Sequence, residues 1–160
     1  MPMTNKKSDV KAKNAYVELL KNRGYQASVV KSPADIKATK DGQDWYFEIK
    51  MTKRSDVYFG AATLTEWKQA FADPDHFRFV VAVTDEAETE FKFIEYTPEE
   101  FMTFSSIPPF KVYFNINLNG KERRRKSSSA RKSPATKLTK ANFELMEHCF
   151  EQLSETNKAQ

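Results

Sequence analysis

The sequence predicts an α/β fold in which helices flank a mixed β-sheet. Segments with helical spacing of apolar residues alternate with segments that have the character of strands. The stretch 76–84 (HFRFVVAVT) is an almost continuous apolar run, typical of a strand buried on both faces. Asp41-Gly42 is a strong signal for the two-residue turn of a β-hairpin. The predicted element order is α-β-β-β-α-β-β-α-β-α, in a single domain over residues 1–160.

The first elements follow from apolar periodicity and helix caps. Residues 8–23 carry apolar side chains with i, i+3, i+4 spacing, which predicts a core-facing helix, and a short strand over 25–31 follows. The hairpin comes next, and then a polar loop leads to a helix at 64–72. Thr63 and Glu66 have the spacing of a capping box at the start of that helix.

The second half of the chain continues the same alternation. Residues 90–96 alternate in polarity and predict a strand beside 76–84. Thr97 is a cap residue followed by proline, which predicts a short helix to about residue 104. A further strand is expected at 111–118, and a last helix is expected at 138–156.

The hairpin turn fixes which side chains share a face. A type I′ turn at Asp41-Gly42 pairs Lys40 with Gln43. Counting back along both arms places Asp35 opposite Glu48, and Lys50 falls on the same face because side chains alternate along a strand. The opposite face is expected to be apolar and to consist of Ala34, Ile36, Ala38, Trp45, Phe47 and Ile49.

Two opposed carboxylates predict a cation between them, because like charges directly across a hairpin are destabilising. Mg²⁺ is usually held by one or two carboxylates with waters, and Mn²⁺ is expected to substitute for it. We therefore predict that Asp35 and Glu48 bind the metal and that Lys50 points at the attacking water or at a phosphate. The alternative is an ordinary hairpin whose outer face is solvated.

Three further residues have two interpretations each. Glu18 lies at the edge of the first helix's apolar stripe, where it would complete the site or would be an ordinary exposed glutamate. Glu66 is better explained as the capping-box residue than as a metal ligand. Thr52 is a phosphate-binding hydroxyl or a plain loop hydroxyl.

The positive charge is concentrated in one segment. The chain has a net charge of +4, but residues 121–140 alone contain nine Lys or Arg against one Glu, which leaves −4 for the rest. A local cationic segment indicates a polyanionic partner, with contacts to the backbone of double-stranded DNA favoured over a passive loop. The residues expected to contact nucleic acid are Lys121, Arg123, Arg124, Arg125, Lys126, Arg131 and Lys132.

The composition also indicates where the protein is expected to act. No apolar run approaches the roughly 18 residues needed to span a bilayer, and the N-terminus lacks the apolar stretch of a signal peptide. A lone Cys149 excludes an internal disulfide framework. We expect a cytoplasmic protein that does not bind membranes.

The order of these features resembles the PD-(D/E)XK nuclease superfamily, whose fold is restriction-endonuclease-like. The resemblance consists of a helix with Glu18, then Pro33-Ala34-Asp35, then Glu48-Ile49-Lys50, then a helix. Over residues 10–84 the pattern PADIKA…WYFEIKMT…LTEWKQA…FRFVVAV is similar to nuclease-like domains of the DUF3883 (NO VEIN C-terminal) type.

This resemblance implies a metal-dependent endonuclease that hydrolyses DNA, with Asp35, Glu48, Lys50 and Glu18 in one catalytic site. Cutting both strands would require a homodimer or sequential nicks. The alternative is a catalytically inactive DNA-binding protein of the same fold, with a regulatory or defence role. The expected organisation is a nuclease-like core at 8–84, a sheet extension at 85–118, a basic flexible loop at 119–137 and a C-terminal helix at 138–156.

Overall fold

The chain divides into two compact units, residues 1–106 and 107–160. The computed structural model describes residues 5–107 and 138–158. The described part of the second unit contains helix α4 (Lys140–Lys158), which confirms the predicted C-terminal helix. The expected strand at 111–118 and the basic segment at 119–137 lie outside the described residues.

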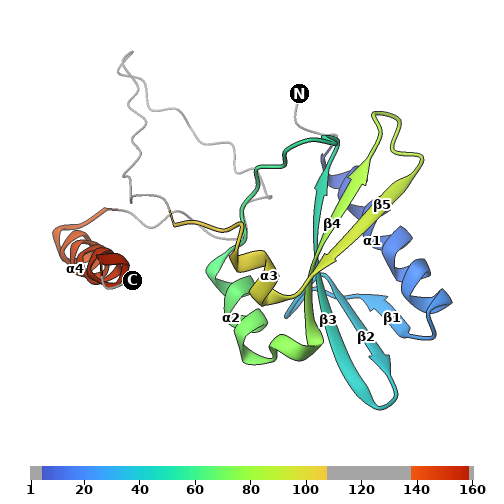
Figure 1. Cartoon of the computed structure of the whole chain (residues 1–160), viewed down its shortest axis with the longest axis horizontal. Helices are drawn as coiled ribbons and strands as arrows, with labels where there is room; N and C mark the ends of the chain where they lie inside the picture. The colour runs from blue at the N-terminus through green and yellow to red at the C-terminus, as the bar shows by residue number, and fades with distance from the viewer. Residues whose placement is uncertain (1–4, 108–137, 159–160) are drawn as a thin grey trace, which may run out of the picture. The chain divides into compact units, whose positions relative to one another are not determined.

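The first unit is built on a five-stranded mixed sheet with the order β1-β2-β3-β4-β5 (Figure 1). β3 and β4 are parallel, whereas the other neighbouring strands are antiparallel. The α/β class and the mixed sheet are therefore confirmed. The strands are β1 (Gln26–Val29), β2 (Ile36–Lys40), β3 (Gln43–Thr52), β4 (Phe77–Thr84) and β5 (Phe91–Tyr96).

Helices cover both faces of this sheet (Figure 1). α1 (Asn5–Asn22) packs on one face, with Tyr16 and Leu20 fully buried against Phe47 of β3. The other face packs around Phe79 of β4, which contacts Trp67 and Phe101. The elements on that face are α2 (Leu64–Ala72), a 3₁₀ turn η1 (Pro74–His76) and α3 (Pro98–Met102). Burial on both faces explains the continuous apolar run in the sequence of β4.

The local signals of the sequence are present in the structure. Asp41 has φ 52° and Gly42 has φ 77°, and Lys40 pairs with Gln43, so the hairpin turn has the predicted positive-φ geometry and register. Complete capping boxes begin α2 at Thr63 and α3 at Thr97. The hairpin turn and the two caps could therefore be located from short-range patterns alone.

Two details differ from the predictions. β3 continues through Met51 and Thr52, where a loop was expected, because parallel pairing with Ala82 and Val83 of β4 extends the strand. Ala34 was expected on the same face as Ile36, but it packs with the cluster on the α2 side of the sheet. The ladder between β2 and β3 starts at Ile36, so the alternation of faces does not extend back to Ala34.

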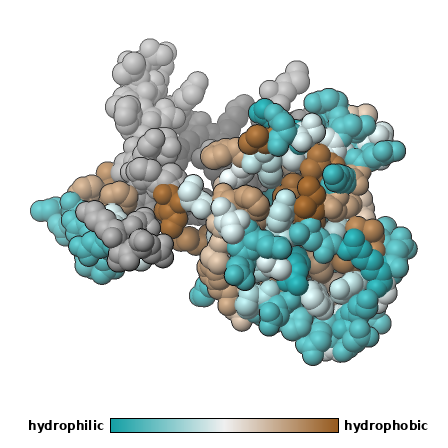
Figure 2. Space-filling view, in the orientation of Figure 1, coloured by the Kyte–Doolittle hydropathy of each residue, from teal (hydrophilic) through white to brown (hydrophobic). Residues whose placement is uncertain are grey.

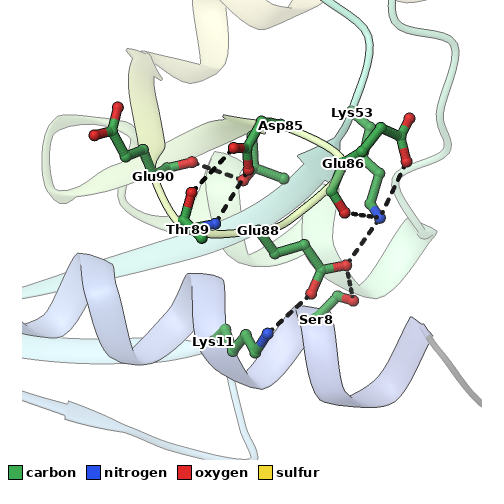
Figure 3. A network of polar contacts seen from close by, with 9 residues as sticks. Ser8, Lys11, Lys53, Asp85, Glu86, Glu88, Thr89 and Glu90 are labelled. Carbon is green, nitrogen blue, oxygen red and sulfur yellow. Dashed lines mark hydrogen bonds and ion pairs between the residues drawn. The ribbon is translucent and has the colours of Figure 1, made fainter.

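A polar network fastens three separate segments together at one end of the sheet (Figure 3). Its centre is Glu88 in the turn between β4 and β5, where φ is 55°. Its carboxylate accepts a hydrogen bond from Ser8 of α1 and pairs with Lys11, at 3.4 Å, and with Lys53 beyond β3, at 3.0 Å. Hydrogen bonds from Ser8 and Lys53 hold the pKa of Glu88 down at about 2. The turn is thus tied to α1 and to the end of β3.

The view in Figure 2 shows a mainly hydrophilic surface in which hydrophobic residues emerge in separate patches. Some large apolar side chains are exposed around the start of α2, among them Phe59 and Leu64. In α4, the large apolar side chains of Phe143 and Phe150 are also exposed. No helix within residues 5–107 and 138–158 is long and apolar enough to cross a membrane.

Candidate active site

Asp35 lies where the ladder between β2 and β3 ends. The last pair joins Ile36 to Phe47, and the next amide of β3 that points toward β2 belongs to Ile49. That N–H donates to Oδ2 of Asp35 at 3.0 Å. The Asp35 side chain thus takes the place of the backbone carbonyl that would accept this hydrogen bond if the ladder continued. The local fold therefore holds the carboxylate beside β3, just beyond the end of the ladder between β2 and β3.

Glu48 is buried although it carries an ionisable group. It lies on β3 beside Phe79 of β4, and only 7% of the residue is exposed. The alternative of a simply solvated outer face therefore does not describe Glu48. Burial raises the pKa of Glu48 to about 8, with further contributions from the negative charges of Asp35 and Glu66, while Lys50 opposes the shift. Without an added cation, Glu48 is mainly protonated at neutral pH.

Lys50 lies between two carboxylates on the face of the sheet that α2 covers. Its Nζ atom is 2.7 Å from Oε2 of Glu66 and 3.3 Å from Oε1 of Glu48. Burial alone would lower the pKa of Lys50, but its hydrogen bond to Glu66 and the charges of both glutamates outweigh burial and raise it. Lys50 is therefore a firmly protonated ammonium whose nearer partner is Glu66.

Glu66 has two roles at once. Its Oε2 atom accepts the backbone N–H of Thr63 at 3.0 Å and also contacts Lys50. The capping-box interpretation is confirmed. Its contact with Lys50 was not predicted, because it depends on where α2 crosses the sheet.

The structure adds a lysine and an aspartate from α1 that the sequence did not indicate. Lys13 Nζ lies 2.7 Å from Oδ1 of Asp35 and 2.8 Å from Oδ2 of Asp9. The Asp9–Lys13 spacing is the i, i+4 spacing of a helical ion pair, so the pair itself could have been found from sequence. Its approach to Asp35 is a tertiary contact that no local pattern announces.

Together these side chains form a row of charges with one irregularity. When all six side chains are ionised, the order Asp9, Lys13, Asp35, Glu48, Lys50 and Glu66 alternates in sign except at its centre. There Asp35 and Glu48 follow one another, and repulsion from Asp35 contributes to the raised pKa of Glu48. The centre of the row is therefore the place where a further cation would be stabilised most.

The remaining predicted site residues are not part of this row. Glu18 pairs with Lys21 at 2.8 Å, and 67% of its side chain is exposed. Thr52 is buried, and its hydroxyl accepts the N–H of Arg54 at 3.1 Å, which is the interaction of a loop hydroxyl. The predicted nucleic-acid contacts at Lys121–Lys132 lie outside the described residues.

The donor set fits a divalent cation that is only partly ligated by protein. Across residues 5–107 and 138–158, no group of three or more His, Cys, Asp and Glu side chains is arranged to hold a metal ion. Mg²⁺ requires fewer protein ligands than that, because one or two carboxylates suffice when water and substrate phosphate complete its shell. Asp35 and Glu48 are the two residues that would hold such an ion.

The fold and this row of charges define an α/β domain with a semi-buried acidic pair and a lysine on one hairpin. The family described as Protein NO VEIN, C-terminal matches residues 8–94, more than half of the chain, and the protein belongs to this family. The matched span contains all six charged residues of the row. No curated protein and no solved structure matches the chain.

Proposed function

We propose that the protein is a metal-dependent endonuclease that hydrolyses phosphodiester bonds in DNA. The observation that supports this most is the burial of Glu48 close to a second carboxylate, Asp35, because burial first and the charge of Asp35 second raise the pKa of Glu48 to about 8. An unfavourable contact of this kind is expected where it serves a ligand rather than stability.

Each residue of the site has a definite part in this proposal. Asp35 and Glu48 would hold Mg²⁺, for which Mn²⁺ would substitute, and the ion would lower the pKa of a bound water and neutralise charge on the phosphate. Lys50 is kept protonated by Glu66 and Glu48. It therefore donates hydrogen bonds to a phosphate oxygen or to the water and does not act as a base.

The proposed substrate follows from charge. Residues 121–140 carry nine Lys or Arg and a single acidic residue. Such a segment binds phosphates without reading sequence, which suits a duplex backbone. A solution experiment on the full chain is needed to test this part, and it should compare DNA with RNA.

A second candidate, a catalytically inactive DNA-binding protein, is favoured by one observation. Lys13 already places an ammonium 2.7 Å from Asp35 and so supplies part of the positive charge that a metal would bring. In this alternative the row of charges is purely structural. Binding to DNA would then be salt-dependent, and divalent metal would have no effect.

Cleavage of supercoiled plasmid with Mg²⁺ or Mn²⁺ tests the proposal directly. We expect Lys50→Gln and Asp35→Asn to reduce cleavage by about 100-fold or more, the loss typical when a charge-stabilising group is removed. Lys37→Gln is the matched control, because Lys37 lies on the same hairpin but pairs with Asp44 at 2.7 Å. Equal cleavage by all four proteins would show that the nuclease is a contaminant or that the site lies elsewhere.

The same preparations separate the two candidates. Salt-dependent binding of duplex DNA without any cleavage in either metal would support the inactive DNA-binding protein. Faster cleavage of RNA than of DNA would show that the proposed substrate is wrong, whereas the assignment of the site residues would stand.

A further inference from the structure

We propose that Lys13 is a positioning residue that sets the metal affinity of the site by competing with the divalent cation for Asp35. This inference rests on the proposed function for the identity of the cation. It assigns a role to a residue of α1 that neither the hairpin register nor the family match addresses.

The contacts of Asp35 show why Lys13 would oppose a metal there, because its ammonium already pairs with one carboxylate oxygen and would repel a divalent cation. Its Oδ2 atom accepts the N–H of Ile49 at 3.0 Å, and its Oδ1 atom lies 2.7 Å from Nζ of Lys13. Both carboxylate oxygens are therefore engaged. The Ile49 contact completes the backbone pattern of β3 and cannot leave without disturbing the sheet. Lys13 has a long side chain that can move, so a metal that binds Oδ1 of Asp35 would displace the ammonium of Lys13 from that oxygen.

Asp9 offers Lys13 a second ion-pair partner that it can keep when Asp35 binds a metal. The two residues are one helical turn apart, and their charged atoms are 2.8 Å apart in the structure. When Asp35 binds a metal, the ammonium of Lys13 keeps its ion pair with Asp9, so Lys13 loses only one of its two ion pairs. The side chain of Lys13 is 17% exposed and that of Asp9 is 44% exposed, so the retained partner lies toward solvent.

Lys50 does not compete in the same way. Its closer contact is with Glu66, at 2.7 Å, and its contact with Glu48 is 3.3 Å. A cation that takes Glu48 therefore leaves Lys50 attached to its main partner. The two lysines of the row thus have different roles. The closest partner of Lys13 is the proposed metal ligand Asp35, whereas the closest partner of Lys50 is Glu66, which is not a proposed ligand.

Two substitutions are expected to change metal affinity in opposite directions. Lys13→Met removes the competitor, and Mn²⁺ should bind about tenfold more tightly, because the binding-competent form of Asp35 becomes the dominant one. Asp9→Asn leaves Lys13 with Asp35 alone, and Mn²⁺ should bind several-fold more weakly for the same reason. Lys13→Gln, which keeps a donor but loses the charge, should lie between wild type and Lys13→Met.

The control variant is Lys21→Met. Lys21 lies on the same helix and forms an exposed pair with Glu18 at 2.8 Å, so this substitution removes an equal charge at a distance from Asp35. Any gain in affinity that comes from net charge alone will be the same in Lys21→Met and Lys13→Met. The difference between them isolates the contact with Asp35.

The experiment is calorimetric titration of MnCl₂ into the full-length chain, stripped with EDTA, at constant pH and ionic strength. Thermal unfolding with and without Mn²⁺ provides a second measurement, and circular dichroism checks that each variant is folded. The expected order of affinity is Lys13→Met, Lys13→Gln, wild type and Asp9→Asn. Mn²⁺ binding by Lys13→Met alone would also support the inference.

The failure of this inference is distinguishable from the failure of the proposed function. If wild type, Lys21→Met and both Lys13 variants bind Mn²⁺ equally, Lys13 does not compete, whereas the metal site stands. If Lys13→Met and Lys13→Gln are folded and no variant binds Mn²⁺, the metal itself is wrong, and the inference falls with it.

Discussion

The raised pKa of Glu48 predicts that this residue makes the protein less stable as the pH rises. The pKa is about 8 in the folded protein against an ordinary value of 4.5. Between these values the folded protein holds a proton that the unfolded chain has lost, so the free energy of unfolding decreases with increasing pH. The contribution is fully present below pH 4.5 and is lost once the pH exceeds about 8.

The magnitude follows from the size of the shift. Each pH unit in this interval costs about 1.4 kcal/mol, so the whole shift amounts to about 4–5 kcal/mol. Glu48→Gln retains the shape and hydrogen-bonding groups of the protonated acid but cannot ionise. Without metal, the free energies of unfolding of the variant and wild type should agree to within about 1 kcal/mol at pH 5. The difference between them should increase as the pH rises above this value. At pH 8–9 it should be more stable by up to about 4 kcal/mol.

Urea unfolding in EDTA between pH 5 and pH 9 measures this difference. Glu18→Gln is the control, because it removes the same charge from an exposed position on α1. If the stability of wild type and Glu48→Gln changes with pH in parallel, Glu48 does not carry the proton, and the description of its buried carboxyl group is wrong.

Three other predictions concern the supports of the site. Asp35→Ala leaves the N–H of Ile49 without its acceptor and should lower the free energy of unfolding by about 1–3 kcal/mol, whereas Asp35→Asn keeps an acceptor and should cost less in urea unfolding. Thr63→Ala removes the cap of α2 and should cost about 1 kcal/mol in the same assay; a change below the error of the measurement would contradict the cap. Glu88 has a lowered pKa of about 2, so its contribution is present above pH 4.5 and is lost as the pH falls toward 2. Glu88→Gln should therefore be less stable than wild type at neutral pH. Its thermal unfolding temperature should also fall less than that of wild type as the pH is lowered toward 2.

The sequence was sufficient for the parts of the site that depend on local geometry. The Asp41-Gly42 turn fixes the pairing of the hairpin, and the structure has that pairing. From this register alone, Asp35 and Glu48 could be placed at the same end of the hairpin. The capping box similarly located the start of α2 and correctly assigned Glu66 to it.

The partners of these residues could not be predicted, because they come from the packing of helices on the sheet. The apolar stripe of α1 points to Glu18 at its edge, but Lys13 is the residue that reaches Asp35. The two lie five residues apart, which is about 7.5 Å along a helix and about 140° around it. Periodicity identifies which face of a helix is buried, but it does not say which polar residue at the edge of that face meets the hairpin.

The oxygen shared by Thr63 and Lys50 gives the site a spectroscopic reporter. Because Oε2 of Glu66 accepts both the Thr63 amide at 3.0 Å and the Lys50 ammonium at 2.7 Å, a ligand that draws Lys50 away leaves that oxygen to the amide alone. The chemical shift and hydrogen-exchange rate of the Thr63 amide should then change, although Thr63 lies on a different element from the hairpin. One backbone resonance would thus register binding events at Lys50 with no label attached to the site.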